Sequence, residues 1–358
     1  MSLSARNADR PNTVHPNTVR PSSVRQIAEI VGVSIATVSR ALNAPHQVTP
    51  ATRNRILEAA SRVGYRPNPL GRNLVVGRSH LVGLIVPNIG FPLYGTMARS
   101  IEDILEPLGL RALLASSDDD AGRELEAANS LLRHAVDGGI VINSRANASL
   151  PSGPRYPWIH LSPESAGLPG AVELDNVAGG RLAAQHLLSL ERRRLAHVAG
   201  EGREGHDREA GFLEGLTVHH LEPVARASGD YSEQTGRAGT RAILERVGRD
   251  GLDGLFLARD IMAAGALREL RAAGLRVPED VAVIGFDDAE FAGLLTPPLT
   301  TVRQPAKAMG AAAAKLLLHS YTLEPRGMLS NQPVLFAPEL VVRGSSVADA
   351  AHDPEIDT

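Results

Sequence analysis

The sequence contains no cysteine, which excludes disulfide bonds and thiolate metal sites and fits a reducing compartment. It also lacks any run of about 18 apolar residues, the length that a membrane-spanning helix requires. The first twenty residues are polar and have no apolar segment of the kind found in signal peptides. We therefore expect a cytoplasmic protein with no membrane partner.

Acidic residues are scarce in one part of the chain. The whole chain has 358 residues and a net charge of −3, but residues 20–78 hold nine arginines and only two acids, a net of +7. Residues 1–19 add +1, so the remaining 280 residues carry −11. A small basic module is thus joined to a large acidic one, which indicates a polyanionic partner for the basic end. A basic face that contacts only solvent is the alternative.

Three short helices are expected in the basic module. Apolar residues at helical spacing predict one over residues 24–31, and Gly32 ends it. Ser34 is a good N-cap for a second over 35–43, and Thr49 for a third that ends at Gly64. The apolar face of the third helix is expected to hold Ile56, Leu57, Ala60 and Val63. A helix, a tight turn and a second helix form the helix-turn-helix arrangement, whose second helix enters the DNA major groove.

From residue 80 onward, apolar runs of strand length alternate with amphipathic helices. The runs lie at 81–86, 110–115, 138–143, 195–199, 254–258 and 281–286. The helical patterns lie near 93–108, 121–135, 176–190, 208–219, 233–247 and 260–273. This alternation predicts parallel sheets with helices on both faces. The similar segments "HAVDGGIVIN" and "RDGLDGLFLA" indicate two α/β lobes, at about 80–160 and 163–290, with residues 290–343 crossing back between them.

An ordered set of motifs resembles the LacI-type (lactose-repressor/galactose-repressor) family of bacterial transcription regulators. The basic module carries "VRQIAEIVGVSIATVSRALN" and "GYRPN", and the acidic part carries "VGLIVPNIGFPLYG", "REAGF", "VPEDVAVIGFDD" and "PLTTVRQP" in the family's order. The resemblance covers about residues 23–343. It implies a helix-turn-helix DNA-binding domain (21–66), a hinge (67–78) and a two-lobed effector-binding and dimerisation domain like that of periplasmic binding proteins (79–343). The polar composition of the two ends predicts a disordered tail (1–20) and a flexible tail (344–358).

The resemblance also implies what the protein does. It implies a repressor that binds a near-palindromic, double-stranded operator as a homodimer and responds to a small-molecule effector, a sugar or a related metabolite. The C-terminal segment "RGSSVADAAHDPEIDT" has no leucine heptads, so we expect a dimer and not a tetramer.

The DNA contacts follow from matching positions in the family. Ile35 and Ala36 match its variable base readers and offer only apolar contact, so Arg40 is expected to supply the hydrogen bonds to bases. Phosphate contacts are expected for Ser34, Thr37 and Ser39, with core packing or helix capping as the alternative for Thr37. Asn43 fits a helix cap and a phosphate contact equally well. The full expected set is Ser34, Ile35, Ala36, Thr37, Ser39, Arg40, Asn43, Tyr65, Arg66, Asn68, Arg72 and Leu74.

The segment "RPNPLGRNL" at residues 66–74 first suggests a linker, because it is rich in proline, glycine and asparagine. Asn68 and the following proline also fit the start of a short helix, which is marginal alone in water. In the family, the matching segment orders on DNA, pairs with its dimer mate and inserts a leucine into the minor groove. Here that leucine is Leu74, an apolar wedge beside Arg72, which is expected on phosphate or the groove edge.

An effector cleft is expected at the carboxyl ends of the strands, where ligands bind in open α/β sheets. Arg208 matches the family's cleft arginine, with a salt bridge as the alternative. Tyr231 matches an aromatic stacking face, and Asp287 matches an acid that accepts ligand hydroxyls. The neighbouring Asp288 is expected to cap a helix. The full expected set is Asn88, Phe91, Leu93, Tyr94, Ser162, Arg208, Tyr231, Arg259, Asp260 and Asp287.

Two departures from the family pattern affect the effector. Arg259 stands where many members have asparagine, so an anionic or acidic effector is expected if Arg259 faces the cleft. The loop over residues 200–207 is shorter than usual, so family contacts between Gly200 and Arg208 do not transfer to it.

Two other classes of protein compete with a regulator. "GEGREG" at 200–205 has the Gly-x-Gly-x-x-Gly spacing of a dinucleotide site after a strand, which leaves an NAD-dependent enzyme as the alternative. Acids crowd the place of a pyrophosphate there, so a chance glycine-rich loop is the preferred interpretation. A solute-binding protein shares the two-lobed fold but needs a signal peptide. No metal-ligand spacing or nucleophile–base pair is found, so we expect no enzyme, no metal and no cofactor.

Gly71 offers a test of the hinge, because the family usually has alanine at that position and glycine costs a helix interior about 1 kcal/mol. We expect Gly71→Ala to tighten operator binding and weaken effector control, as measured by electrophoretic mobility shift. Unchanged affinity would mean that residues 66–74 form a passive spacer.

Overall fold

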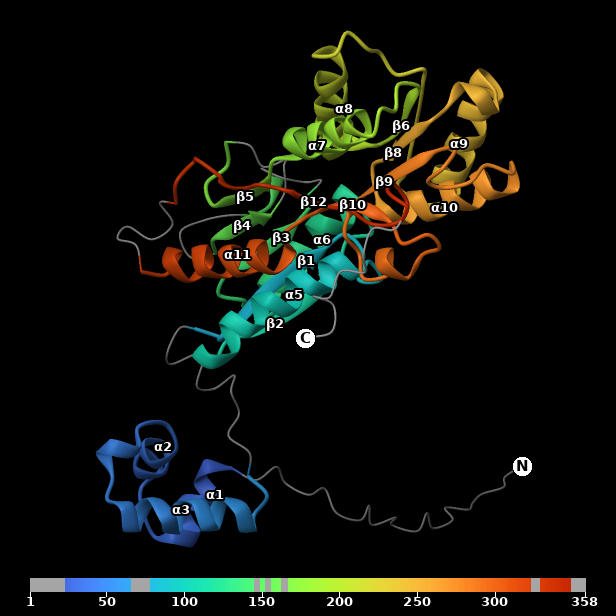
Figure 1. The fold of residues 1–358 in the computed structure, drawn as a ribbon. Helices are drawn as coiled ribbons and strands as arrows, with labels where there is room; N and C mark the ends of the chain where they lie inside the picture. The colour runs from blue at the N-terminus through green and yellow to red at the C-terminus, as the bar shows by residue number, and fades with distance from the viewer. Residues whose placement is uncertain are drawn as a thin grey trace, which may run out of the picture. The chain divides into compact units, whose positions relative to one another are not determined.

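The computed structural model describes residues 23–65, 78–144, 149–151, 156–161, 167–322 and 329–348 (Figure 1). The chain forms two compact units, Met1–Ser79 and His80–Thr358. Residues 67–77 of the expected hinge (67–78) lie outside the described residues.

Capping residues fix where each helix of the first unit starts. α1 (Val24–Val31) follows Ser23, α2 (Ile35–Asn43) follows Ser34 and α3 (Pro50–Arg62) follows Thr49; each cap side chain accepts a backbone N–H from the first turn. Gly32 has a φ of 72°, the left-handed conformation that turns the chain between α1 and α2. A 3-10 turn, η1 (Pro45–Gln47), joins α2 to α3.

The three helices enclose a small apolar core of their own. The sequence expectation for α3 was wrong at one position, because Leu57 is 40% exposed while Ala59 is buried. The residues of α3 that pack into this core follow the helical spacing i, i+3, i+4 and i+7, and Leu57 lies one position off that stripe. They are Ile56, Ala59, Ala60 and Val63.

The second unit contains two six-stranded sheets, one in each lobe. The first sheet has the order β11-β5-β4-β3-β1-β2, and its neighbouring strands are parallel. Its strands are β1 (Leu81–Val86), β2 (Arg111–Ser116), β3 (Gly139–Ile142), β4 (Trp158–Leu161), β5 (Ala171–Leu174) and β11 (Val334–Phe336). One face is covered by α5 (Pro92–Leu105), with the turn η2 (Glu106–Leu108), and α11 (Ala306–Ser320); the other is covered by α6 (Ala121–Arg133).

The second sheet has the order β12-β10-β9-β8-β6-β7 and is parallel except for the antiparallel pair β10–β12. Its strands are β6 (Leu195–Gly200), β7 (Ala225–Gly229), β8 (Gly254–Leu257), β9 (Ala282–Asp287), β10 (Thr300–Arg303) and β12 (Glu339–Val341). One face is covered by α7 (Asn176–Ser189) and α8 (Gly202–Thr217), the other by α9 (Glu233–Val247) and α10 (Asp260–Ala272), with the turns η5 (Arg249–Gly251) and η6 (Ala292–Leu294). Two α/β lobes, each built around a sheet of mainly parallel strands, confirm the expected fold class.

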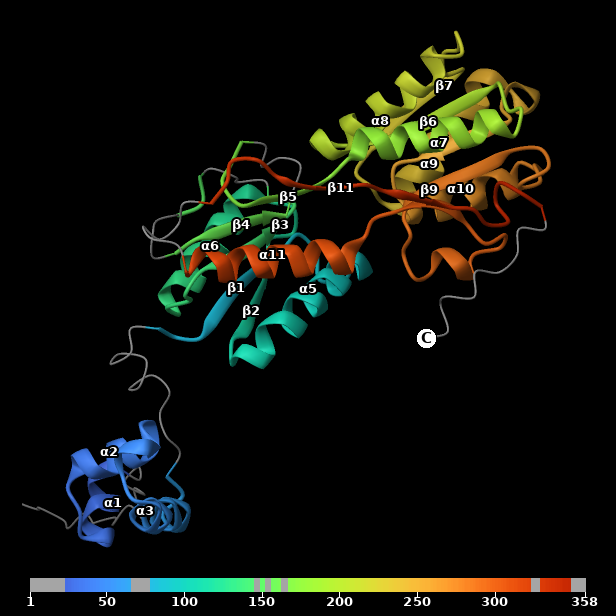
Figure 2. The same ribbon diagram turned by 60° about the vertical axis from the view of Figure 1, so that its left-hand side comes forward.

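The chain crosses between the lobes at three connections: β5 to α7, β10 to α11, and β11 to β12. Figure 2 shows α11 lying across the first sheet and the segment after β11 running on into the second lobe. The sequence placed residues from 163 onward in the second lobe, but β5 pairs with β4 and belongs to the first sheet. Short connections of this kind leave hinge bending as the natural relative motion of the lobes.

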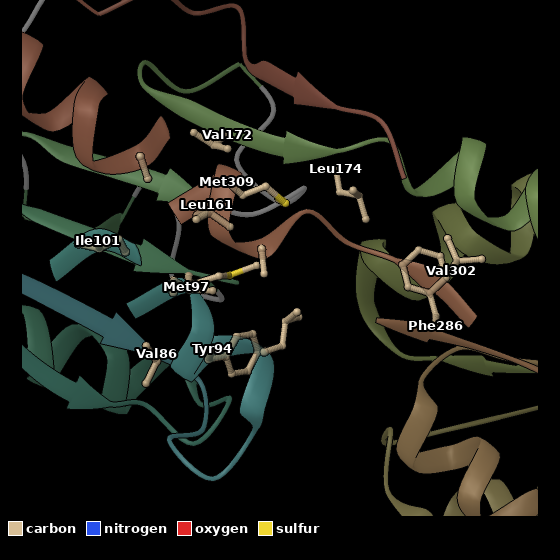
Figure 3. Packing of buried hydrophobic residues seen from close by; sticks show 14 of the residues in the cluster. Val86, Tyr94, Met97, Ile101, Leu161, Val172, Leu174, Phe286, Val302 and Met309 are labelled. Carbon is tan, nitrogen blue, oxygen red and sulfur yellow. The ribbon is translucent and has the colours of Figure 1, made fainter. Parts of the chain in front are cut away.

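The largest apolar cluster draws on both lobes. Figure 3 shows Tyr94, Met97 and Leu161 near the place where α5 and α11 meet the first sheet, with Phe286 and Val302 on the second lobe. None of the helices in the described part of the chain combines the length and apolar character that crossing a bilayer requires.

Helices α7 and α8 cross at close range because glycines stand at the contact. A Cβ atom at Gly180 would lie 1.9 Å from the backbone oxygen of Arg208, and one at Gly211 would lie 1.8 Å from that of Val177. No side chain fits at these distances without moving the backbone. The crossing therefore fixes where α8 presents Arg208.

We expect Gly180→Ala to lower the free energy of unfolding by about 1–3 kcal/mol, the usual cost of overpacking, because the helices must separate. Gly95→Ala on α5 is the matched control: its Cβ meets nothing within 4 Å, and alanine favours a helix by up to about 1 kcal/mol. Urea unfolding measures both changes. Equal effects of the two substitutions would show that the α7–α8 contact tolerates a side chain.

Candidate functional site

Helix α2, which the sequence predicts to enter the DNA major groove, presents small and apolar side chains together with one arginine. Ile35 is 53% exposed, and Ala36, Ser39 and Arg40 are also exposed, whereas Val38 is fully buried. This face has the composition that close approach to base edges requires.

The start of α2 is held by its own hydroxyl groups. The Ser34 side chain accepts the backbone N–H of Thr37 at 3.1 Å, and the two hydroxyls are hydrogen-bonded at 2.8 Å. Thr37 thus takes part in the capping interaction that the sequence left open. A phosphate contact by either hydroxyl requires it to keep or replace this bond.

Of the expected DNA contacts at the end of the first unit, Tyr65 packs partly buried against the core of that unit. Several other expected DNA and effector residues are not described by the structure. The side chain of Asn43 is not described, and the positions outside the described residues are Arg66, Asn68, Arg72, Leu74 and Ser162.

The effector cleft is built from strand ends of both lobes. Phe91 precedes α5, and Leu93 and Tyr94 form its first turn, just after β1. Tyr231 follows β7, Arg259 follows β8 and Asp287 ends β9. Parallel strands end at the same edge of a sheet, so these side chains come together. Asn88 also follows β1; it is exposed, and its side chain accepts the backbone N–H of Gly90 at 2.8 Å.

Arg208 is fully buried, and each of its three guanidinium nitrogens has a hydrogen-bond partner. Its Nε donates to Asn176 at 2.9 Å and its Nη1 to the backbone oxygen of Ala258 at 2.6 Å, while Nη2 bonds the carboxylate of Glu204. Its guanidinium also lies 3.7 Å from the centre of the Phe286 ring and 3.7 Å from the Asp287 carboxylate. The salt-bridge alternative therefore describes Arg208 in this structure.

Arg259 faces the cleft and spans the two lobes. Its guanidinium lies 4.2 Å from the centre of the Tyr231 ring in the second lobe and 4.8 Å from that of Phe91 in the first. Its Nη2 donates to the Tyr94 hydroxyl at 3.1 Å. Burial opposes its charge, but the nearby Tyr94, Glu204 and Asp287 outweigh burial, and its pKa is raised further. Arg259 therefore stays a cation inside the cleft.

Glu204 is a cleft residue that the sequence did not predict. The glycine-rich segment was expected to form a loop and the helix to start at 208, but α8 starts at Gly202. A Cβ at Gly205 would lie 2.1 Å from the backbone oxygen of Gly200. Glycine at this position therefore lets α8 pack closely against the end of β6, and a phosphate-binding loop is not needed to explain it. The available signal was the spacing of four residues between Glu204 and Arg208, which places both on one helix face.

Glu204 also reaches across to the first lobe. Asn143, just after β3, donates to its carboxylate at 3.2 Å and to the Tyr94 hydroxyl at 2.9 Å. Arg259 lies 3.5 Å from the same carboxylate oxygen. Asn143 was likewise absent from the sequence prediction. Together these four side chains form a polar bridge between the lobes.

Asp287 and Asp260 form a buried acidic pair behind the bridge. Burial raises the pKa of Asp287 to about 6, although Arg208 and Arg259 oppose the shift. Burial, with Asp287 nearby, raises the pKa of Asp260 well above its usual value. Asp260 accepts the Thr301 hydroxyl at 2.6 Å and the backbone N–H of Ala289 at 2.8 Å, so it supports the end of β9 from behind and does not line the cleft surface.

The expectation that Asp288 caps a helix was wrong. Its carboxylate lies 2.7 Å from both Arg303 and Arg343 instead. Residues 289–291 after it form no helix, so no free N–H groups need a cap, and two arginines from β10 and the C-terminal segment supply the partners.

The space left between the lobes is small. A cavity of about 20 Å³ is lined by Leu93, Tyr94 and Asn143 of the first lobe and by Asn176 and Glu204 of the second. This is room for roughly one water molecule. The cleft in this conformation is filled by its own side chains, and a larger molecule enters only as the lobes part.

Two polar atoms in the cleft wall have no hydrogen-bond partner among the described residues. They are the Nε of Arg259 and the Oδ2 of Asp287, both buried and 3.8 Å apart. Buried polar atoms without partners are rare in folded proteins and point to a missing third group. In the described ranges, no three histidine or carboxylate side chains gather closely enough to hold a metal ion.

Comparison with known proteins connects both units to one family. The description "Bacterial regulatory proteins, lacI family" matches residues 23–68, and "Periplasmic binding protein-like domain" matches residues 184–346. The ribose operon repressor of Bacillus subtilis (strain 168) is 34% identical over 310 residues, which cover 86% of this chain and 92% of the relative. The HTH-type transcriptional repressor CytR of Escherichia coli (strain K12) is 33% identical over 325 residues, 88% of this chain and 94% of CytR.

Solved structures agree over most of the chain. A lac repressor dimer bound to operator and the anti-inducer ONPF has a TM-score of 0.78 at 26% identity, covering 92% of this chain and 100% of that chain. A complex of the transcriptional regulator CelR with cellobiose has a TM-score of 0.66 at 31% identity, covering 91% and 100%. These relatives are regulators and not enzymes, and the chain belongs to the lacI family of bacterial regulatory proteins.

Proposed function

We propose that the protein represses transcription from a near-palindromic operator as a homodimer, and that a neutral polyhydroxyl effector bound between the lobes controls it. The exposed face of α2 supports the DNA-binding half of the proposal. The buried Arg259 and Asp287 atoms without partners carry the effector half.

A hydroxyl group is the chemistry that fits these two atoms. The Arg259 Nε is a donor that needs an acceptor, and the ionised Asp287 Oδ2 is an acceptor that needs a donor. One hydroxyl accepts from the first and donates to the second. A carboxylate or phosphate oxygen has no proton to give Asp287 and is repelled by it.

The balance of charge in the cleft also favours a neutral effector. Arg208 and Arg259 face Glu204 and Asp287, and burial raises the pKa of the adjoining Asp260 well above its usual value, which disfavours a further negative charge there. The two positive charges are therefore already offset. From the sequence, Arg259 alone suggested an acidic effector; its surroundings in the structure support a sugar instead.

Relatives give independent support for this class of ligand. One matched structure is a complex of CelR with cellobiose, and another is a LacI family regulator from Enterococcus faecium with bound ribose. Both ligands are neutral and rich in hydroxyls. The likeness supports this class of ligand for the present chain and not either particular sugar.

The cleft explains how such an effector reaches the DNA. Its wall includes residues of both lobes, so a bound molecule favours one angle between them. That angle sets how the two hinges of a dimer are presented, and so biases operator affinity. The "GEGREG" segment has no role as a dinucleotide site in this proposal, because a Cβ at Gly200 would lie 1.9 Å from the Tyr231 ring and Glu204 points into the cleft.

Selection of bound sequences from random DNA tests the first half. We expect Arg40→Ala to weaken operator binding by about 1–3 kcal/mol and to relax base preference at its position. Arg62→Ala removes the same charge from the exposed end of α3, and should weaken binding evenly across sequences. Wild-type binding that ignores both salt and sequence would contradict the proposal.

The acidic pair gives a pH test of the cleft's charge balance. Acids whose pKa is raised on folding make stability fall as pH rises, so Asp260 and Asp287 contribute a loss of stability between pH 5 and 8. His160 and His197, whose pKa burial lowers to about 4, contribute in the opposite direction up to about pH 6.5. Asp260→Asn removes one acid and keeps both histidines, so its midpoint of thermal unfolding should rise relative to that of wild type as pH goes from 5 to 8. Asp280→Asn is the control: Arg276 lowers the pKa of Asp280 to about 2, so it does not titrate there. Parallel curves for wild type and Asp260→Asn would show that Asp260 carries no raised pKa.

A further inference from the structure

Glu204 makes more contacts than a surface acid at the start of a helix requires. An acid in the first turn normally faces solvent and interacts with the helix dipole. The Glu204 side chain is only 14% exposed and touches a residue 61 positions away in the other lobe. Its position therefore serves the cleft as well as the helix.

Each carboxylate oxygen of Glu204 meets one of the two buried arginines. Oε1 bonds Arg208, whose side chain is fully buried, and Oε2 lies 3.5 Å from Arg259, whose side chain is 12% exposed. Asn143 donates to Oε2 at 3.2 Å from the first lobe. A small anion bound between two arginines and an amide would be held in the same way.

Asp287 cannot replace Glu204 as the closest anion to Arg208 and Arg259. Its nearest contacts with Arg208 and Arg259 are 3.7 and 3.8 Å, longer than hydrogen bonds, and its Oδ1 accepts from Gln304. Removing Glu204 would leave the outer donors of both arginines without their closest anion. An uncompensated buried charge is strongly unfavourable.

We propose that Glu204 is the resident anion of the cleft and that it makes the effector site reject acidic ligands. This deepens the proposed function and rests on it, since it assumes that the cleft binds an effector. An acidic ligand would have to displace Glu204 from its arginines or place a second anion beside it. A neutral sugar can bind beside Glu204 and keep it in place.

Chemical rescue tests the resident anion without knowledge of the effector. Glu204→Ala removes the carboxylate and leaves room for one, so we expect a lower unfolding temperature that sodium formate restores and sodium chloride at equal ionic strength does not. Glu204→Gln fills the space, so formate should not restore it. Glu214→Ala is the matched control, because Glu214 lies on the same helix and pairs with Arg181 at 2.7 Å, but on the surface. No formate response specific to Glu204→Ala overturns the proposal.

Paired sugars test the rejection of acids. The probes are D-glucose with D-glucuronate, D-galactose with D-galacturonate, and D-ribose with D-ribose 5-phosphate, titrated by calorimetry into the full chain. For any pair that binds, wild type should favour the neutral member, and Glu204→Gln should shift the ratio of dissociation constants toward the acid by about tenfold or more. Glu214→Gln should leave the ratio unchanged.

The two experiments separate the possible failures. If wild type binds an acid as tightly as its neutral partner, or Glu204→Gln leaves the ratio unchanged, the proposed selectivity is wrong even when formate restores stability. If no sugar binds, the effector class under Proposed function is wrong, and the formate result alone decides whether Glu204 is the resident anion.

Discussion

The buried guanidinium of Arg208 needs acceptors around it, and four separate element ends supply them. Asn176 begins α7, Glu204 lies one turn earlier on α8, Ala258 follows β8 and Asp287 ends β9. A charge taken out of water is tolerated only with such partners. The second lobe therefore packs fully only when these ends meet at one point, and that point is the wall of the cleft. The same contacts of Arg208 therefore hold the core of the second lobe together and position the side chains of the cleft.

Much of the fold was predictable because the apolar pattern of each element agrees with its final burial. The expected helix 233–247 has the bounds of α9, and the expected strand 81–86 has those of β1. The prediction failed where packing and not pattern decides. Glycines disfavour a helix, yet α8 starts at Gly202 and includes Gly205. Glycine is needed at position 205, because a side chain there would collide with the end of the preceding strand. Packing of this kind is invisible in a single sequence.

The site was predictable only in part, for a related reason. The resemblance pointed to Arg208, Arg259 and Asp287, each of which stands at a strand end or on a helix that starts there. Glu204 and Asn143 acquire their roles from contact between the lobes, and a separation of 61 positions in the sequence gives no pattern that would pair them. Their roles depend on how far the cleft closes, which residue order alone does not encode.

The bridge between the lobes also limits what an effector can do. A ligand shifts a conformational equilibrium only by the difference between its affinities for the two states. Glu204 with Asn143, and Arg259 with Tyr94, already join the lobes in this conformation. A ligand that merely took over these contacts would leave the equilibrium near its starting point. Control of the lobe angle must therefore come from contacts that the protein does not make for itself. In the proposed function, a ligand hydroxyl bonded to Arg259 and Asp287 holds the ligand on the second lobe, and the new contacts of that ligand with the first lobe set the angle.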